Sequence, residues 1–126
     1  MSQNPIELTK PEWSIMKVLW EKGPSAARNV EAELKNTRNW AYSTVNTMLR
    51  RLETKGVLAT DQIGKVTFYR PVITEKKAKR SAVKQLCEKL FGGSTEPLMK
   101  FLLENEKVSE QHFREIQELI DERRSK

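Results

Sequence analysis

Residues 43–56 read STVNTMLRRLETKG, and the order of residue types in this stretch decides the fold. Its apolar side chains follow the i, i+3, i+4, i+7 spacing of a buried helix face. They are Val45, Met48, Leu49 and Leu52. At about 100° per residue, the polar and basic side chains gather on the opposite face. They are Ser43, Asn46, Thr47, Arg50 and Thr54. Gly56 ends this predicted helix, which therefore has one core face and one polar, basic face.

Two helices are predicted before this stretch. In LTKPEW, Thr9 is a cap and Glu12 completes a capping box, which predicts a helix start. The apolar stripe of this first helix comprises Trp13, Met16, Leu19 and Trp20, with Ile15 at its edge and Val18 off it. Gly23-Pro24 ends the helix, and Ser25 is the expected cap of a second one. The apolar side of the second helix comprises Ala27, Val30 and Leu34.

Two β-type runs follow residue 56. They are VLATDQ (57–62) and KVTFYR (65–70), joined across Ile63-Gly64, which predicts a hairpin. Three helices followed by a hairpin is the order of a winged helix-turn-helix domain. The sequence therefore predicts a mainly α fold with a small β-hairpin, and a winged-helix DNA-binding domain over residues 1–72.

The remaining segment, 73–126, is predicted to form three helices rich in large apolar side chains. A segment this small rarely buries such a set alone. Packing against a second copy is therefore the preferred prediction, and folding back onto the winged domain is the alternative. The residues expected to pair are Leu86, Leu90, Phe91, Leu98, Met99, Phe101, Leu102, Phe113, Ile116, Leu119 and Ile120.

The net charge of +6 suits a polyanionic partner, either nucleic acid or an anionic membrane surface. Of the 23 bases, 11 lie in residues 1–72, with 7 of the 17 acids. From Arg38 to Lys55 four bases accompany a single acid, Glu53. The positive charge is therefore concentrated around the third predicted helix.

The polar face of that helix has the chemistry of a major-groove reader. A major groove admits one α-helix, whose short polar side chains approach base edges while basic groups hold phosphates. A solvated helix face is the alternative, but Lys65 and Arg70 in the hairpin and Arg38 before the helix favour DNA. The predicted DNA-binding residues are Arg38, Ser43, Thr44, Asn46, Thr47, Arg50, Arg51 and Lys65.

Other classes of protein are disfavoured. No apolar run approaches the roughly 20 residues that span a bilayer, and MSQNPIELTK does not have the pattern of a signal peptide. We therefore expect no membrane among the partners of this protein. A single cysteine, Cys87, is typical of a protein of the reducing cytoplasm, and we expect its thiol to be packed in the core. We expect the single histidine, His112, to be a solvated or capping residue. No phosphate-binding glycine loop or nucleophile–base pattern appears. We therefore expect no enzyme, no cofactor and no metal site.

Three stretches together carry a family resemblance. EWSIMKVLW (12–20), TVNTMLRRLETKG (44–56) and LFGGS (90–94), ahead of a helical tail, resemble the penicillinase repressor family (BlaI/MecI/CopY type). The resemblance covers nearly the whole chain and implies a winged-helix repressor that binds palindromic operators as a homodimer.

The resemblance also implies residue roles. Ser43, Thr44, Asn46 and Thr47 would contact bases, and Arg38, Arg51 and Lys65 the DNA backbone. Asn46 stands where some members have arginine. Penicillinase-type members are inactivated by a protease that cuts an Asn-Phe bond, and the matching bond here is Lys100-Phe101. The copper-responsive branch carries Cys-x-Cys motifs, which this chain lacks.

The sequence therefore predicts a homodimeric winged-helix transcriptional repressor. A winged-helix protein-interaction adaptor that does not bind specific DNA is the alternative from another class. Non-specific DNA packaging is a weaker one.

Overall fold

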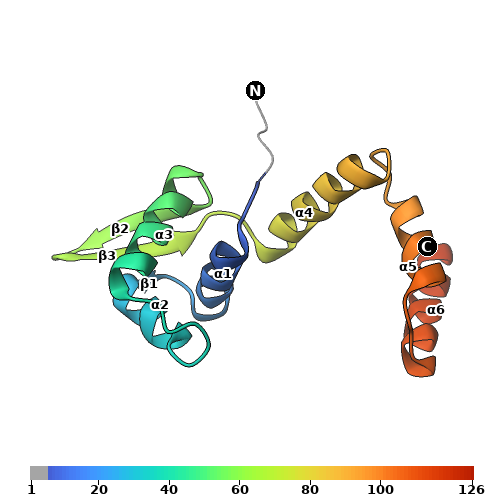
Figure 1. The fold of residues 1–126 in the computed structure, drawn as a ribbon, viewed down its shortest axis with the longest axis horizontal. Helices are drawn as coiled ribbons and strands as arrows, with labels where there is room; N and C mark the ends of the chain where they lie inside the picture. Colours follow the sequence, from blue (N-terminus) through green and yellow to red (C-terminus); the bar gives the residue numbers. More distant parts are fainter. Residues whose placement is uncertain (1–5) are drawn as a thin grey trace. The chain divides into compact units, whose positions relative to one another are not determined.

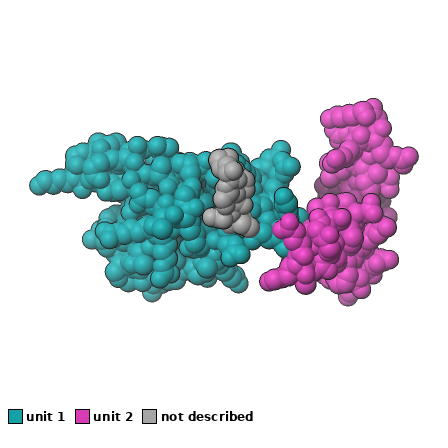
Figure 2. All heavy atoms as spheres, turned by 90° about the horizontal axis from the view of Figure 1, so that it is seen from above, with its two compact units in different colours: residues 1–85 teal, residues 86–126 magenta. Residues whose placement is uncertain are grey.

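The computed structural model describes residues 6–126 of the chain. The elements, in chain order, are α1 (Lys10–Lys22), β1 (Ser25–Ala26), α2 (Ala27–Leu34), α3 (Tyr42–Thr54), β2 (Leu58–Ile63), β3 (Val66–Pro71), α4 (Glu75–Leu90), α5 (Glu96–Asn105) and α6 (Glu110–Arg124) (Figure 1). The predicted class, mainly α with a small hairpin, is confirmed. The chain divides into two compact units, Met1–Gln85 and Leu86–Lys126 (Figure 2).

Helix α1 begins where the capping box predicts. Thr9 Oγ1 accepts a hydrogen bond from Glu12 N at 3.3 Å, and Glu12 Oε1 accepts one from Thr9 N at 2.8 Å. The buried face is displaced from the predicted stripe, because Ile15 is fully buried whereas Trp13 and Trp20 are only half-buried. Val18, predicted to lie off the stripe, packs against the core. Helix α1 contacts α2, α3 and β3, and several neighbours bury a wider arc than one neighbour would.

The core of the first unit lies among α1, α2, α3 and the sheet. All four apolar residues of the α3 stripe are buried, as predicted. Each large apolar side chain buried in this way contributes about 1.5–3 kcal/mol to folding. The core comprises Ile15, Met16, Leu19, Ala27, Val30, Leu34, Val45, Met48, Leu49, Leu52, Val57, Leu58 and Tyr69.

The predicted hairpin is present, with a turn one residue later than expected. Ile63 pairs with Val66 at the end of β2, so the turn residues are Gly64 and Lys65. Gly64 has φ +62°, a conformation that favours glycine at the first central position of a type II′ turn.

The sheet has a third strand that the sequence did not predict. Strand β1 pairs with β3, Ser25 opposite Tyr69 and Ala26 opposite Phe68, giving the order β1-β3-β2. The expectation that Ser25 caps α2 is wrong, because Ser25 lies in this strand and its Oγ donates to Gly23 O at 2.9 Å. A strand of two residues is too short to show an alternating pattern.

Helix α4 is shared between the two compact units. Its residues up to Gln85 belong to the first unit, where Ala78 is buried and Ser81 Oγ accepts a hydrogen bond from Ile6 N at 3.4 Å. Gln85 Nε2 donates to Ile6 O at 2.8 Å. The division falls after Gln85, whereas the composition changes after residue 72, because one continuous helix crosses the boundary. The functional division into 1–72 and 73–126 stays a prediction.

The second unit comprises the end of α4, with α5 and α6. Cys87 is fully buried, and the rings of Phe91 and Phe101 lie 5.8 Å apart. Helices α5 and α6 contain no buried residue. The large apolar side chains of this unit are therefore partly or largely exposed in the single chain, with Leu90 at 63% and Leu119 at 65%.

Candidate nucleic-acid interface

The outer face of α3 is open to solvent. Helix α3 begins at Tyr42, and Ser43, Thr44, Thr47, Arg50 and Arg51 are exposed while Asn46 is half-buried. Burial of the opposite stripe fixes this orientation, because turning the helix would expose four core side chains. The structure therefore brings the predicted reading residues of α3 onto one accessible surface.

Two hydroxyls of α3 bond to their own helix. Thr47 Oγ1 donates to Ser43 O at 2.9 Å, and Thr54 Oγ1 donates to Arg50 O at 3.0 Å. The Thr47 hydroxyl proton is thereby engaged, which leaves its oxygen as an acceptor and its methyl group as an apolar contact. A threonine methyl group placed in this way can make an apolar contact with the C5-methyl group of thymine.

The two arginines of α3 keep their full charge available. None of the ion pairs between described residues involves Arg50 or Arg51. Both guanidiniums are exposed, and each offers five N–H donors. The arginines are therefore free to bond to an external anion.

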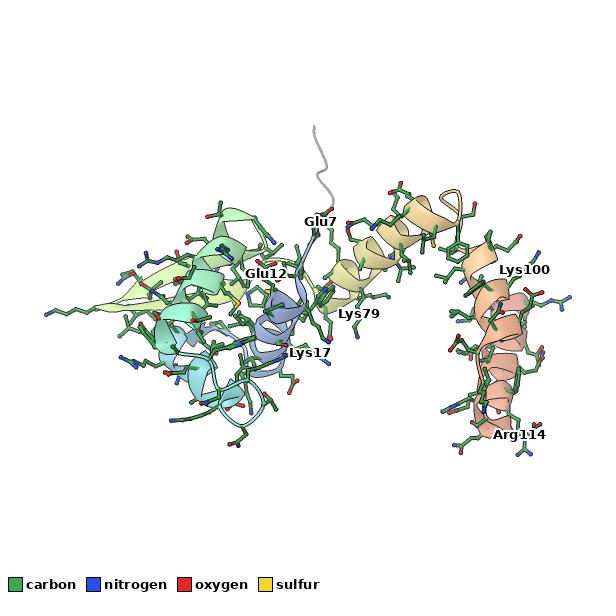
Figure 3. All side chains as sticks on the ribbon, viewed as in Figure 1. Glu7, Glu12, Lys17, Lys79, Lys100 and Arg114 are labelled. Atoms are coloured by element: carbon green, nitrogen blue, oxygen red, sulfur yellow. The ribbon has the colours of Figure 1, made fainter. Side chains whose placement is uncertain are left out.

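Lys55, which the sequence counted among the bases around α3, is engaged within the protein itself. Its Nζ lies 2.6 Å from Glu12 Oε1 and donates to Glu7 O at 2.8 Å. Figure 3 labels Glu7 and Glu12 near the start of α1. Burial raises the pKa of Glu12, but the hydrogen bonds from Lys55 and Thr9 outweigh it, and the net pKa is lowered. The charge of Lys55, one of the four bases counted around α3, is therefore balanced by the Glu12 carboxylate of α1. The ion pair attaches the C-terminal end of α3 to α1.

The wing, which is the hairpin formed by β2 and β3, carries one exposed lysine at its turn. Lys65 lies beside Gly64 where β2 passes into β3. Arg70, which the sequence placed beside it as a second base, forms an ion pair with Asp61 across the two strands, Nε to Oδ2 at 2.8 Å. The positive charge of the wing therefore comes chiefly from Lys65.

Arg38 precedes α3 and is held against α1. Its Nη2 donates to Ser14 Oγ at 3.2 Å, and its guanidinium carbon lies 5.5 Å from the centre of the Trp40 ring. Arg38 is exposed, so these contacts orient its side chain and leave other N–H donors accessible.

Two residues at this surface were missed by the sequence reasoning. The guanidinium carbon of Arg28, in α2, lies 3.9 Å from the centre of the Tyr42 ring at the start of α3. The two residues are far apart in the sequence, and no periodicity relates them. An aromatic residue at the first position of the reading helix was the available signal.

Residues 8–122 match the family model described as Penicillinase repressor. The chain belongs to the penicillinase repressor family. The methicillin resistance regulatory protein MecI of Mammaliicoccus sciuri is 24% identical over 98% of this chain and 100% of its own length. The penicillinase repressor of Staphylococcus aureus is 23% identical over 97% of each chain.

Two solved structures resemble the fold. The solution structure of the DNA-binding domain of the repressor BlaI is 36% identical, with a TM-score of 0.52 over 60% of this chain and 90% of that one. Bacillus licheniformis BlaI, a monomeric form in complex with the blaP half-operator, is 33% identical, with a TM-score of 0.51 over 60% and 92%. The predicted family and winged-helix class are confirmed.

Three further features of the described residues concern metal ligands, His112 and the length and hydropathy of the helices. Within residues 6–126, no group of three or more His, Cys, Asp or Glu side chains is placed to hold a metal ion. His112 is exposed and its backbone N–H donates to Ser109 Oγ at 3.2 Å, as expected of a residue in a capped first turn. None of the helices in this range is long and apolar enough to cross a bilayer.

Proposed function

We propose that this protein is a DNA-binding transcriptional repressor that binds a palindromic operator as a homodimer, through α3 and the β2–β3 wing. One observation carries the proposal. Helix α3 buries its apolar stripe and presents its short polar side chains to solvent, with two arginines that form no ion pair within residues 6–126. The family membership and the half-operator complex of the BlaI relative support it.

In this proposal the residues of α3 have two roles. Ser43, Thr44, Asn46 and Thr47 contact base edges, since short side chains allow the helix to approach the floor of the groove. Arg50 is long enough to reach a guanine or a phosphate. Arg51, together with Arg38 before the helix and Lys65 in the wing, contacts the DNA backbone, which sets register and does not itself select sequence.

The proposed dimer uses the second unit. Its eleven predicted pairing residues are partly or largely exposed in the single chain, and leaving many large apolar side chains in water is costly. A two-fold dimer places two reading helices about 34–36 Å apart, or a multiple of that distance, which matches a palindromic site. Double-stranded DNA and a second copy are therefore the proposed partners.

An inactivating protease is a further proposed partner. The bond between Lys100 and Phe101 lies inside α5, where the Lys100 side chain is 72% exposed (Figure 3). In the single chain, helix α5 contains no buried residue, so opening it locally costs little before two chains pair. Cleavage there would separate α6 from the rest of the proposed dimerisation segment. We place the protein in the cytoplasm, without enzymatic activity, because the proposed role needs access to DNA alone.

A selection experiment tests the proposal. Duplexes bound by the full-length chain are selected from random-sequence DNA, and the affinity for the selected duplex is compared with that for a scrambled duplex of equal length. We expect a palindromic selected sequence and a preference of about 10³-fold or more. Equal affinity for both duplexes would favour non-specific packaging, and binding to neither would favour the protein-interaction adaptor.

A further inference from the structure

We infer that Arg28 of α2 contacts a DNA phosphate beside the reading helix and that the Tyr42 ring holds it in position. This inference rests on the proposed function and adds to the DNA-binding surface a residue outside α3, the wing and the predicted set. Arg28 and Tyr42 come from the two successive helices of the helix-turn-helix, and α2 and α3 are in contact.

The stacking geometry leaves Arg28 ready to bind an anion. Its guanidinium carbon lies 3.9 Å from the centre of the Tyr42 ring, and its side chain is 74% exposed. Stacking occupies one flat face of a guanidinium, whereas its five N–H donors point outward around the edge. The ring therefore restricts the position of the charge without consuming its hydrogen-bonding capacity.

The nearest acid competes only weakly. Arg28 Nη1 lies 3.6 Å from Glu31 Oε1, longer than the 2.7–2.9 Å of a strong charge-assisted hydrogen bond. Both groups lie on the same helix three residues apart, with the Arg28 side chain 74% exposed and the Glu31 side chain 26% exposed. A long contact of this spacing holds the exposed guanidinium weakly and leaves it able to exchange for a closer anion. A phosphate oxygen that accepts a short hydrogen bond from Arg28 would replace the Glu31 carboxylate as its partner.

The position of Arg28 favours a phosphate over a base. In a helix-turn-helix the second helix enters the major groove, while the helix before it crosses the DNA backbone. Arg28 is on the earlier of the two helices, and Tyr42 begins the later one, directly before Ser43 and Thr44. The stacked pair thus lies at the side of the reading surface, where backbone contacts are made.

The test uses the full-length chain and two duplexes, the selected sequence and its scrambled version, over a series of salt concentrations. Arg28→Ala is compared with Arg124→Ala, which removes the same charge from the last turn of α6. We expect Arg28→Ala to weaken binding to both duplexes roughly tenfold, as for the loss of a charged hydrogen bond. The slope of log K against log salt should fall in magnitude by about 0.9, the value for one phosphate contact. Arg124→Ala should change neither quantity.

A second set of variants tests the ring. Tyr42→Phe keeps the stacking surface and should bind like the unmodified chain, whereas Tyr42→Leu should weaken binding to both duplexes. In an Arg28→Ala background, Tyr42→Leu should have no further effect, because the residue that the ring positions is gone. Melting temperatures verify that each variant is folded, and both side chains are exposed enough for the fold to tolerate the changes. If Tyr42→Leu were unfolded, Arg28→Lys would replace it, and it should keep the salt slope while binding more weakly.

Each contrary outcome has a distinct meaning. Arg28→Ala behaving like Arg124→Ala overturns the inference while the proposed function stands. A loss confined to the selected duplex shows that Arg28 reads a base, which overturns the phosphate assignment. An undiminished effect of Tyr42→Leu in the Arg28→Ala background, or unweakened binding by Arg28→Lys where it is used, overturns the role of the ring. Binding of neither duplex by the unmodified chain refutes the proposed function, and this inference with it.

Discussion

Lys55, just after the reading helix α3, places its ammonium 2.6 Å from the carboxylate of Glu12 in the first turn of α1. Glu12 is only 3% exposed, and it also caps α1 through Thr9. One buried carboxylate thus starts one helix and anchors the end of another, and two predictions follow from this arrangement.

Lys55→Met should lower the free energy of unfolding by about 1–3 kcal/mol, because it leaves the buried Glu12 carboxylate without its cationic partner. Urea unfolding followed by circular dichroism measures the change. Lys17→Met is the matched control, since Lys17 is an exposed lysine of α1 outside the ion pairs of the described residues. Equal stability of the two variants would show that the ion pair contributes nothing.

Stability should fall in acid through the same carboxyl group. The pKa of Glu12 is lowered from its ordinary 4.5 in the folded protein, because the bonds from Lys55 and Thr9 outweigh burial. The unfolded chain therefore binds the proton more readily. The contribution of Glu12 is present above pH 4.5 and is lost as the pH falls through the lowered pKa. Urea unfolding at several pH values should give a stability difference between the unmodified chain and Glu12→Gln that shrinks below pH 4.5. A constant difference would contradict the assignment.

Two substitutions on α3 should separate base reading from backbone binding. Asn46→Ala should reduce the preference for the selected duplex over a scrambled one, by about 1–3 kcal/mol if Asn46 makes a bidentate base contact. Arg51→Ala should weaken binding to both duplexes and reduce the salt slope by about 1. Fluorescence anisotropy titrations at two salt concentrations measure both effects. Equal losses on the two duplexes for Asn46→Ala would refute its role in reading sequence.

Leu119→Glu should dissociate the proposed dimer without unfolding the chain. Leu119 is 65% exposed, so a charge there costs the single chain little, whereas at an apolar interface it would be buried and unpaired. Sedimentation equilibrium should give the mass of a dimer for the unmodified chain and of a monomer for the variant. Gln111→Glu, on an exposed polar position of the same helix, is the control and should stay dimeric. A monomeric unmodified chain would overturn the dimer proposal.

Much of the fold was accessible from the sequence. The stripe of α3, the capping box of α1 and the hairpin all follow from interactions between residues within a few positions of one another. The burial of Ile15 and the strand β1 do not follow from such local interactions. The first depends on which elements pack against α1, and the second depends on pairing with β3. For the candidate site, the exposed face of α3 was predictable, because burial of one helix face exposes the other.

The sequence by itself determined the helices, the hairpin and the polar face that α3 presents, because periodicity and capping act over single turns. Only the tertiary structure decided which charges remain free. It paired Lys55 with Glu12, 43 residues away, and it stacked Arg28 on Tyr42. These contacts depend on how helices and strands pack against one another, and no local pattern of residues encodes that packing.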